Sequence, residues 1–360
     1  MDKNVIPDKH RAAFLVNFKS PLEMGYTDTI MPEGDQVLIR VSGAGICHSD
    51  VHVWEGIWYK GGSPGKLPHI QSHEISGIVV STGNSVPERI KPGDPVLVYP
   101  WQWLEDDRYT AAGLTNIPDR PVVPGINIHG GFQEYFPVSH YRYLINATGI
   151  EDLPALAPLS CGGLTTYRAV KKLGGKLKPD DYVAVVGLGG LGSYALQYLR
   201  LLFPQVNIIG ADIRNDSIEF AEGICRMDGY INSSSGDINK MIMETTRGHG
   251  FRGVIDLVGR GTLPTYSRAL AKEGIYVMVG LMGTGVQEPI SPFFTVSMEK
   301  TIAGSYVGTL SEQHEVVDLA RKGLINYIKP VSSRMDLEDA SEGLKNLEDG
   351  KALGRQVVVF

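Results

Sequence analysis

Residues 182–192 constrain the fold of this chain more than any other segment. An apolar run at 182–186 leads directly into a glycine-rich sequence, Gly187, Leu188, Gly189, Gly190, Leu191 and Gly192, and a second apolar run follows at 194–202. The first glycine of such a sequence permits a tight turn, the second lets backbone approach a pyrophosphate, and the third lets helix and strand pack closely. The segment therefore predicts a strand, a turn and a helix whose N-terminus binds a dinucleotide.

The residues that follow predict a doubly wound parallel α/β sheet, because strands alternate with helices. We expect strands at 206–210, 254–258 and 276–279 and a helix at 216–224. Asp212 closes the second strand, where a carboxylate accepts hydrogen bonds from the adenosine ribose and repels a 2′-phosphate. We therefore assign Asp212, Ile213 and Arg214 to the cofactor site and favour NAD. The cation of Arg214 leaves NADP open as the less favoured cofactor, and a glycine-rich turn without a ligand is the structural alternative.

The N-terminal part of the chain predicts an all-β, barrel-like domain. Short apolar runs separated by Gly and Pro indicate strands at 12–16, 37–41, 75–80 and 96–99, and a last strand is expected at 354–360. Residues 100–130 contain four prolines and no clear periodicity, which predicts a long loop or lobe.

The overall composition excludes several classes of protein. A chain of 360 residues is long enough for two domains. Its formal net charge of -6 argues against nucleic acid and anionic membrane as partners, and the absence of an apolar run of about 18 residues argues against a membrane span. Three cysteines, Cys47, Cys161 and Cys225, do not make a disulfide framework and suggest a reducing, cytoplasmic setting.

Three scattered residues could together bind a metal ion. Cys47 follows a predicted strand, His73 precedes Glu74, and Cys161 lies just before the predicted nucleotide domain. Two thiolates and one imidazole form a catalytic zinc set, which leaves a fourth position for water or substrate. Spacing alone does not establish the site, since single cysteines are usually buried apolar residues, the role we expect for Cys225.

The segment 45–56, Gly-Ile-Cys-His-Ser-Asp-Val-His-Val-Trp-Glu-Gly, resembles the catalytic zinc segment of zinc alcohol dehydrogenases of the medium-chain dehydrogenase/reductase superfamily. The closest likeness is to the tetrameric yeast and bacterial branch. The resemblance covers nearly the whole chain and includes His73-Glu74, Lys91-Pro92-Gly93-Asp94, 130–135, the Cys161 segment, the Gly187 fingerprint and Gly354-Arg355.

This resemblance implies an NAD-linked, zinc-dependent oxidoreductase that interconverts small alcohols with aldehydes or ketones. It implies a GroES-like catalytic domain at 1–162 and 304–360, a Rossmann domain at 163–303, and a cytoplasmic homo-oligomer, with a tetramer favoured. The ion would act as a Lewis acid toward the alcohol, which then gives hydride to the nicotinamide.

The resemblance also assigns roles around the metal. It makes Cys47, His73 and Cys161 the ligands, and Glu74 a carboxylate that enters the coordination sphere transiently. Asp50 resembles the carboxylate that orients the His73 ring. The alternatives without a functional role are a surface or structural Glu74 and an Asp50 that caps a local turn.

Further roles follow for residues near the cofactor and the substrate. Ser49 and His52 resemble the proton relay to solvent, with a capping serine and a surface histidine as alternatives. His48 and Arg355 resemble residues that meet the cofactor phosphates, and Thr165 resembles a residue beside the nicotinamide. Trp54 and Trp58 would narrow the substrate pocket, although core packing explains them nearly as well.

The sequence departs from this family in two places. Many relatives bind a second, structural zinc through four cysteines, but residues 95–130 contain none. We therefore expect one zinc per chain and a lobe held by packing around Trp101, Trp103 and Tyr109. The second departure is Ser72, where relatives usually have Gly before the His-Glu pair.

Three other functions remain as alternatives. A polyol or sugar dehydrogenase of the same superfamily often replaces one zinc cysteine with a carboxylate, and a zinc-free quinone or enoyl reductase lacks the ligand set altogether. A non-catalytic nucleotide-binding relative would keep the glycines without needing the ligands.

Overall fold

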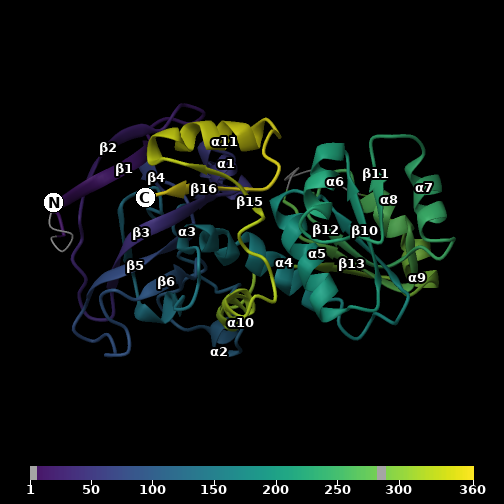
Figure 1. Ribbon diagram of the computed structural model, residues 1–360, viewed down its shortest axis with the longest axis horizontal. Coiled ribbons are helices and arrows are strands. Elements are labelled where there is room, and N and C mark those ends of the chain that lie inside the picture. Colours follow the sequence, from purple (N-terminus) through teal and green to yellow (C-terminus); the bar gives the residue numbers. More distant parts are fainter. Residues whose placement is uncertain (1–5, 282–288) are drawn as a thin grey trace. The chain divides into compact units, whose positions relative to one another are not determined.

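The computed structural model describes residues 6–281 and 289–360, and its chain divides into two compact units (Figure 1). Unit 1 comprises Met1–Cys161, Thr309–Gly323 and Val331–Phe360, and unit 2 comprises Gly162–Gly308 and Leu324–Pro330. We predicted domain limits after residue 162 and at residue 304. The observed units change at residue 161, and 304–308 and 324–330 belong to unit 2.

Unit 2 is built on a parallel sheet with the strand order β11-β10-β9-β12-β13-β14 in the described part of the chain. The strands are β9 (Tyr182–Val186), β10 (Asn207–Asp212), β11 (Gly229–Asn232), β12 (Phe251–Asp256), β13 (Leu270–Met278) and β14 (Thr301–Gly304). In this doubly wound order the direction of winding reverses between β9 and β12, and ligands bind outside the carboxyl ends of the strands at that point. The predicted parallel sheet is confirmed.

Helices connect these strands. They are α4 (Gly162–Lys171), α5 (Gly190–Leu202), α6 (Asn215–Glu222), α7 (Ile238–Thr245), α8 (Leu263–Arg268) and α9 (Pro292–Ser297). The predicted helix at 216–224 corresponds to α6, and the run at 194–202 lies within α5. The short strands β11 and β14 were not predicted, because four residues with one or two large apolar side chains give little periodic signal.

The described residues of unit 1 form two sheets. The larger has the order β15-β16-β3-β5-β6-β8, with β7 also paired to β3, and the smaller has the order β2-β1-β4. The strands are β1 (Lys9–Leu15), β2 (Glu23–Asp28), β3 (Val37–Ile46), β4 (His69–Ile70), β5 (Glu74–Thr82), β6 (Pro95–Val98), β7 (Tyr135–Val138), β8 (Leu144–Asn146), β15 (Val331–Met335) and β16 (Arg355–Val359). Apart from the parallel pair β15 and β16, neighbouring strands in the described part of unit 1 pair antiparallel.

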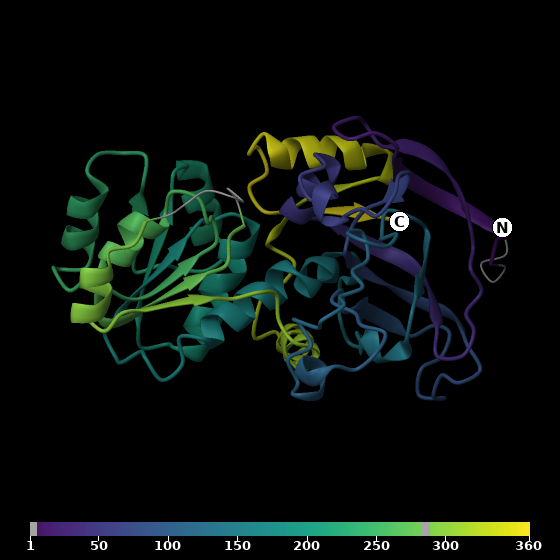
Figure 2. The same ribbon diagram turned by 180° about the vertical axis from the view of Figure 1, so that it is seen from behind.

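The C-terminal segment completes the larger sheet of unit 1. Strand β16 pairs antiparallel with β3, so that Val357 lies opposite Gly45. Figures 1 and 2 show this yellow strand beside the purple strands of the N-terminal part, seen from the front and from behind. The pairing brings residue 355 into the sheet that carries 46 and 74.

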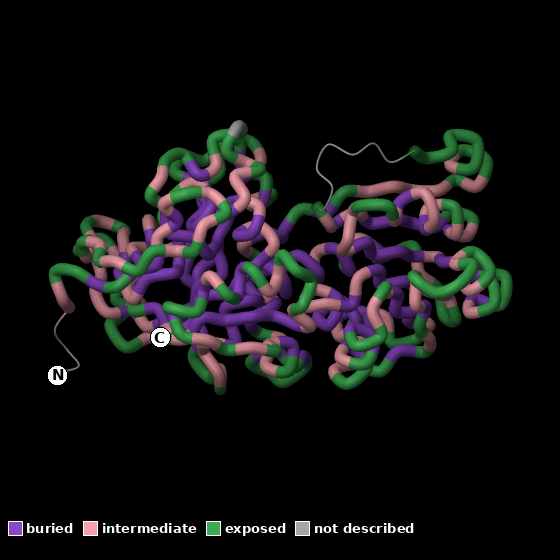
Figure 3. The backbone as a smooth tube through the Cα atoms, turned by 90° about the horizontal axis from the view of Figure 1, so that it is seen from above, coloured by how far each residue is buried: buried purple, intermediate pink, exposed green. Residues whose placement is uncertain are grey.

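Short helices surround these sheets. They are α1 (His48–Trp54), α2 (Arg108–Ala111), α3 (Leu153–Leu156), α10 (Leu310–Arg321) and α11 (Ala340–Glu348), with single 3-10 turns at Tyr59–Gly61, Tyr141–Tyr143, Ala157–Ser160 and Leu337–Asp339. Figure 3 shows that buried segments gather in the interior of each unit, and strands such as β3 and β9 are largely buried. No helix in the described ranges has the length and apolar character needed to cross a bilayer.

Backbone hydrogen bonds to a single carboxylate organise part of the lobe at 100–130. The carboxylate of Asp107 accepts from the backbone N–H groups of Tyr109 (2.8 Å), Thr110 (2.9 Å) and Asp119 (2.6 Å), and these bonds hold its pKa below the usual range. The lobe also contributes aromatic packing, since Trp103 is buried and lies edge-on to Tyr143 with ring centroids 5.2 Å apart. The carboxylate was not part of the predicted packing, which named only aromatic rings.

Candidate metal and cofactor sites

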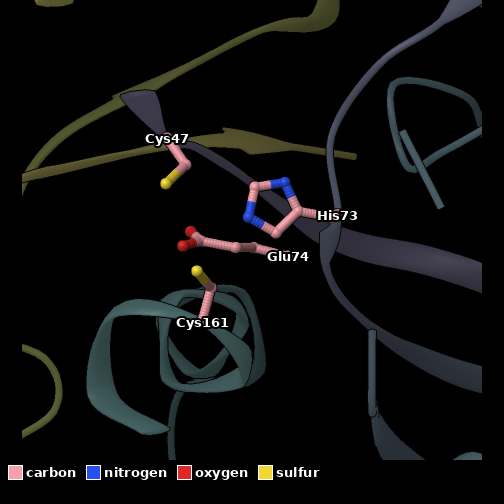
Figure 4. A group of neighbouring side chains, drawn as sticks. All are labelled: Cys47, His73, Glu74 and Cys161. Atoms are coloured by element: carbon pink, nitrogen blue, oxygen red, sulfur yellow. The ribbon is translucent and has the colours of Figure 1, made fainter. Parts of the chain in front are cut away.

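Four side chains from distant parts of unit 1 converge on one buried point (Figure 4). Cys47 follows β3, His73 and Glu74 lie at the start of β5, and Cys161 follows the 3-10 turn Ala157–Ser160. One ligand atom from each of the four lies within 4.8 Å of the others, and all four residues are buried. Among the described residues, this is the group of three or more His, Cys, Asp and Glu side chains that could hold a metal ion.

The antiparallel pairing of β3 and β5 places Gly45 opposite Glu74. A Cβ atom on Gly45 would lie 2.0 Å from Oε2 of Glu74, so only glycine leaves room for this carboxylate. Gly45 belongs to the segment that resembles the zinc segment of the family, but its physical role depends on the pairing of the two strands.

Asp50 connects the two ligand-bearing segments. Its Oδ2 accepts the backbone N–H of Cys47 at 2.9 Å, and its Oδ1 accepts that of Ser72 at 3.0 Å. Its Oδ1 also lies 3.6 Å from Nδ1 of His73. The first contact is a capping box at the start of α1. Asp50 therefore caps α1 and also lies beside the His73 ring, so the two roles considered for it are compatible.

Ser72 adopts a backbone conformation that favours glycine, with φ at 75°. Its side chain is fully buried, and its hydroxyl donates to the carbonyl oxygen of Gly45 at 2.9 Å. The departure from the glycine of relatives therefore adds a hydrogen bond between the segments that carry Cys47 and His73, at the cost of a strained φ angle.

His73 has the environment of a metal ligand. Neither ring nitrogen has a hydrogen-bond partner in the protein, although the side chain is completely buried. Buried polar atoms are normally satisfied, so this ring fits a ligand that the four side chains would share. Burial opposes the charged ring, but the negative charge of Asp50 and the neighbouring Cys47 raise the pKa of His73 well above its ordinary value.

The two thiols are electrostatically inequivalent. A hydrogen bond between them lowers the pKa of Cys47 well below its ordinary value, against the effect of burial, while the same bond and burial raise the pKa of Cys161. Thiolate is the form of cysteine that binds metal ions. A buried pair of sulfurs with one easily deprotonated member, beside an unsatisfied imidazole, fits zinc, which prefers sulfur and nitrogen ligands.

Glu74 is held by an arginine that comes from the far end of the sequence. Nη2 of Arg355 lies 2.5 Å from Oε2 of Glu74, and both side chains are buried. Burial raises the pKa of Glu74 to about 7, and the positive charge of Arg355 opposes this rise. We predicted that Arg355 contacts cofactor phosphates. The structure places its guanidinium on Glu74, and the phosphate contact stays a prediction.

The other predicted residues of unit 1 lie on or just after α1. His48 and His52 are partly exposed, and burial lowers the pKa of each ring. The His52 ring lies 5.1 Å from that of Trp58, and Ser49 is also partly exposed. Trp54 is buried and donates to the carbonyl oxygen of Ser20 at 2.7 Å. The relay and pocket roles of these residues stay predictions.

The glycine fingerprint in unit 2 has the geometry that its pattern predicts. Gly187 has φ at 94°, and a Cβ on Gly192 would lie 2.3 Å from the carbonyl oxygen of Gly187. Helix α5 begins at Gly190 with Gly189 as N-cap, which makes no side-chain capping bond. The N–H groups at this helix end therefore lack a side-chain acceptor and fit a phosphate.

Asp212 lies at the carboxyl end of β10, directly beside the fingerprint. Its Oδ2 accepts the backbone N–H of Leu188 at 2.7 Å, and its Oδ1 accepts that of Arg214 at 3.0 Å. Each carboxylate oxygen has two lone pairs, so acceptor capacity remains for ribose hydroxyls. Ile213 is 65% exposed beside it, and Thr165 is buried in α4 of the same unit.

Comparison with known proteins gives the family. Residues 33–149 match the model of the alcohol dehydrogenase GroES-like domain, and residues 190–322 match that of the zinc-binding dehydrogenases. An NAD-dependent alcohol dehydrogenase of Saccharolobus solfataricus is 39% identical over 97% of this chain and 99% of its own length. The chain belongs to the zinc-type alcohol dehydrogenase family. It is an oxidoreductase with the predicted fold, a GroES-like domain joined to a doubly wound parallel sheet.

Two further relatives show the range of the family. A D-arabinose 1-dehydrogenase (NADP(+)) of the same organism is 33% identical over 99% of both chains. The crystal structure of an alcohol dehydrogenase from the archaeon Aeropyrum pernix has a TM-score of 0.87 and 32% identity, and covers 97% of this chain and 100% of that one. The family membership is thus supported by sequence and by fold.

Sequence reasoning missed two contributors to the candidate metal site and one buried carboxylate elsewhere, in unit 2. The ion pair between Arg355 and Glu74 depends on the pairing of β16 with β3, which no local pattern reveals. The bond from Ser72 to Gly45 depends on the pairing of β3 with β5. The third is the buried carboxylate of Asp256 at the end of β12, which accepts the hydroxyl of Tyr276 at 2.8 Å. The feature of the sequence that could have indicated Asp256 is an acidic residue at the end of an apolar run.

Proposed function

We propose that this chain catalyses the NAD-linked interconversion of alcohols with aldehydes or ketones, at one zinc ion held by Cys47, His73 and Cys161. The observation that carries the proposal is the convergence of these three side chains with Glu74 on one buried point, where both nitrogens of His73 are unsatisfied. A single zinc is supported by the absence of cysteine from the sequence at 95–130.

In this proposal the residues of unit 1 bind and orient the metal. Asp50 holds the backbone of both ligand segments and places negative charge near His73, which keeps the ring in position. When bound, zinc would supply a Lewis acid for the substrate oxygen. Arg355 balances the charge of Glu74, so this carboxylate can stay beside the sulfurs without entering the coordination sphere permanently.

The residues of unit 2 bind the cofactor. The backbone N–H groups at the N-terminus of α5 donate to the pyrophosphate, and Gly192 lets this helix approach the turn at Gly187 closely. Asp212 accepts the adenosine ribose hydroxyls, which favours NAD. The relative that shares 39% identity is itself named an NAD-dependent enzyme.

The proton released by the alcohol leaves through Ser49 and His52 in this proposal. Burial lowers the pKa of His52, so its ring is neutral near pH 7 and can accept a proton. Its Nδ1 is buried and has no hydrogen-bond partner in the protein, which leaves this atom available for transfer.

The test is NADH formation, followed by absorbance, with a panel of primary, secondary, aromatic and polyol alcohols. We expect turnover that is lost on chelation and restored by zinc. Cys161→Ser should lose both zinc and activity, whereas Cys225→Ser, which alters a free cysteine outside the cluster, should keep both. Turnover that persists without metal, or in the Cys161 variant, would sink the zinc mechanism.

A sugar or polyol dehydrogenase is the second candidate, because a relative of 33% identity is named as a D-arabinose dehydrogenase. Activity confined to polyols or sugars in the same panel would favour it over the simple alcohols. Binding of NADH without turnover of any substrate would instead favour a non-catalytic nucleotide-binding protein.

We further propose a cytoplasmic homo-oligomer, with a tetramer favoured. Strand β14 ends the described strand order of its sheet, and the nearby helix α9 exposes Phe293 (72%) and Val296 (77%). An unpaired sheet edge beside exposed apolar side chains is a surface that a second copy would cover. Light scattering after size exclusion tests this, and a monomeric mass would contradict it.

The three free cysteines support a reducing compartment.

A further inference from the structure

The guanidinium group of Arg214, which lies two residues after Asp212, is bound by the carboxylate of Asp216. Arg214 donates from Nε to Oδ1 of Asp216 at 2.9 Å and from Nη2 to Oδ2 of the same residue at 2.5 Å. This two-point contact engages the fork of the guanidinium that otherwise recognises carboxylates and phosphates. Both side chains reach solvent, with 31% of Arg214 and 55% of Asp216 exposed.

The backbone fixes both partners of this ion pair. The N–H of Arg214 donates to Oδ1 of Asp212, so its side chain starts beside the carboxylate that would accept the ribose hydroxyls. Asp216 lies in the first turn of α6, and its Oδ1 also accepts the backbone N–H of Ser217 at 2.8 Å. A negative side chain is favourable at this end of a helix, so the carboxylate is held where it meets Arg214.

This arrangement bears on the choice between the two nicotinamide cofactors, and so rests on the proposed function. NADP differs from NAD by a 2′-phosphate, which an arginine near the end of this strand accommodates in proteins that bind NADP. Here Arg214 donates to both carboxylate oxygens of Asp216, so a 2′-phosphate would have to compete with this carboxylate for the guanidinium group.

We propose that Asp216 is a specificity-determining residue, which disfavours NADP by keeping the guanidinium of Arg214 bound to itself. Asp212 and Asp216 then act in different ways. Asp212 meets the ribose directly, whereas Asp216 acts through Arg214.

The test measures binding of NADH and NADPH by titration calorimetry to the full-length protein. Exposed ion pairs are individually weak, so we expect Asp216→Asn to raise the affinity for NADPH relative to NADH by about fivefold, and the gain to shrink at high salt. In the double variant Asp216→Asn/Arg214→Gln, this gain should disappear. Asp237→Asn is the matched control, because Asp237 likewise accepts backbone N–H groups at the start of a helix of unit 2. It should leave the ratio unchanged.

Three outcomes would contradict the proposal or the function on which it rests. If the wild type binds NADH and Asp216→Asn leaves the ratio unchanged, Asp216 does not determine specificity. If the gain survives in the double variant, it does not act through Arg214, and the proposed route is wrong. If the wild type binds neither nucleotide, the proposed function fails and this inference fails with it. Asp216→Ser repeats the measurement with a second neutral side chain, and circular dichroism checks that each variant is folded.

Discussion

His69 should make the stability of unit 1 depend on pH in the mildly acidic range. The residue lies in β4, is 3% exposed, and its Nε2 has no hydrogen-bond partner in the protein. Burial lowers its pKa to about 4. The unfolded chain, with an ordinary pKa of about 6.5, then binds the proton more tightly than the folded protein does. The contribution of His69 is therefore complete above about pH 6.5 and is lost as the pH falls toward 4. Its size at pH 4.5 is about 2.5 kcal/mol, because each of the two pH units below 6.5 contributes about 1.4 kcal/mol and the folded ring is itself partly protonated by pH 4.5.

The assay compares urea unfolding of the wild type and His69→Asn at pH 7.5, 6.0 and 4.5. Asparagine places an amide nitrogen near the position of Nδ1 but does not titrate. The stability of the wild type should fall by about 2.5 kcal/mol more than that of the variant between the highest and lowest pH. His249→Asn, which changes an exposed histidine, is the control and should follow the wild type. Parallel pH profiles for the wild type and His69→Asn would refute the argument.

Substitutions at three other residues test contacts of the candidate metal site and of unit 2. Ser72→Ala should lower the free energy of unfolding by about 1–2 kcal/mol, because the bond to Gly45 is lost, while Ser72→Gly should recover about 1 kcal/mol of this by relieving the positive φ angle. Thermal unfolding that ranks Gly below Ala would contradict this. Asp50→Asn should weaken zinc binding about 10–100-fold in a chelator competition, since one oxygen cannot serve both ligand segments, and an unchanged affinity would remove Asp50 from the site. Tyr276→Phe should cost about 1–2 kcal/mol, because buried Asp256 loses a donor; equal stability in urea would show that the bond is dispensable.

The geometry of the proposed nucleotide site was predictable because the residues that define it lie close together in the sequence. The apolar strand, the glycines at fixed spacing and the acid at the end of the next strand lie within about thirty residues, and each follows from the geometry of one turn. The proposed zinc ligands carry no such local pattern. Cys47, His73 and Cys161 are separated by long stretches, so their chemistry alone left a metal site open, and only the resemblance of the surrounding segments selected it.

The sequence by itself determined the alternation of strands and helices, the parallel sheet of unit 2 and the glycine-rich turn, since these depend on periodicity and on backbone freedom at glycine. The tertiary structure alone decided which charges meet. The strand pairings put Arg355 on Glu74, let Ser72 bond Gly45, and leave room for Glu74 through the missing side chain of Gly45. Such contacts join residues that are far apart in the chain, and their free energy arises from burial and strand register, which no local pattern of the sequence encodes.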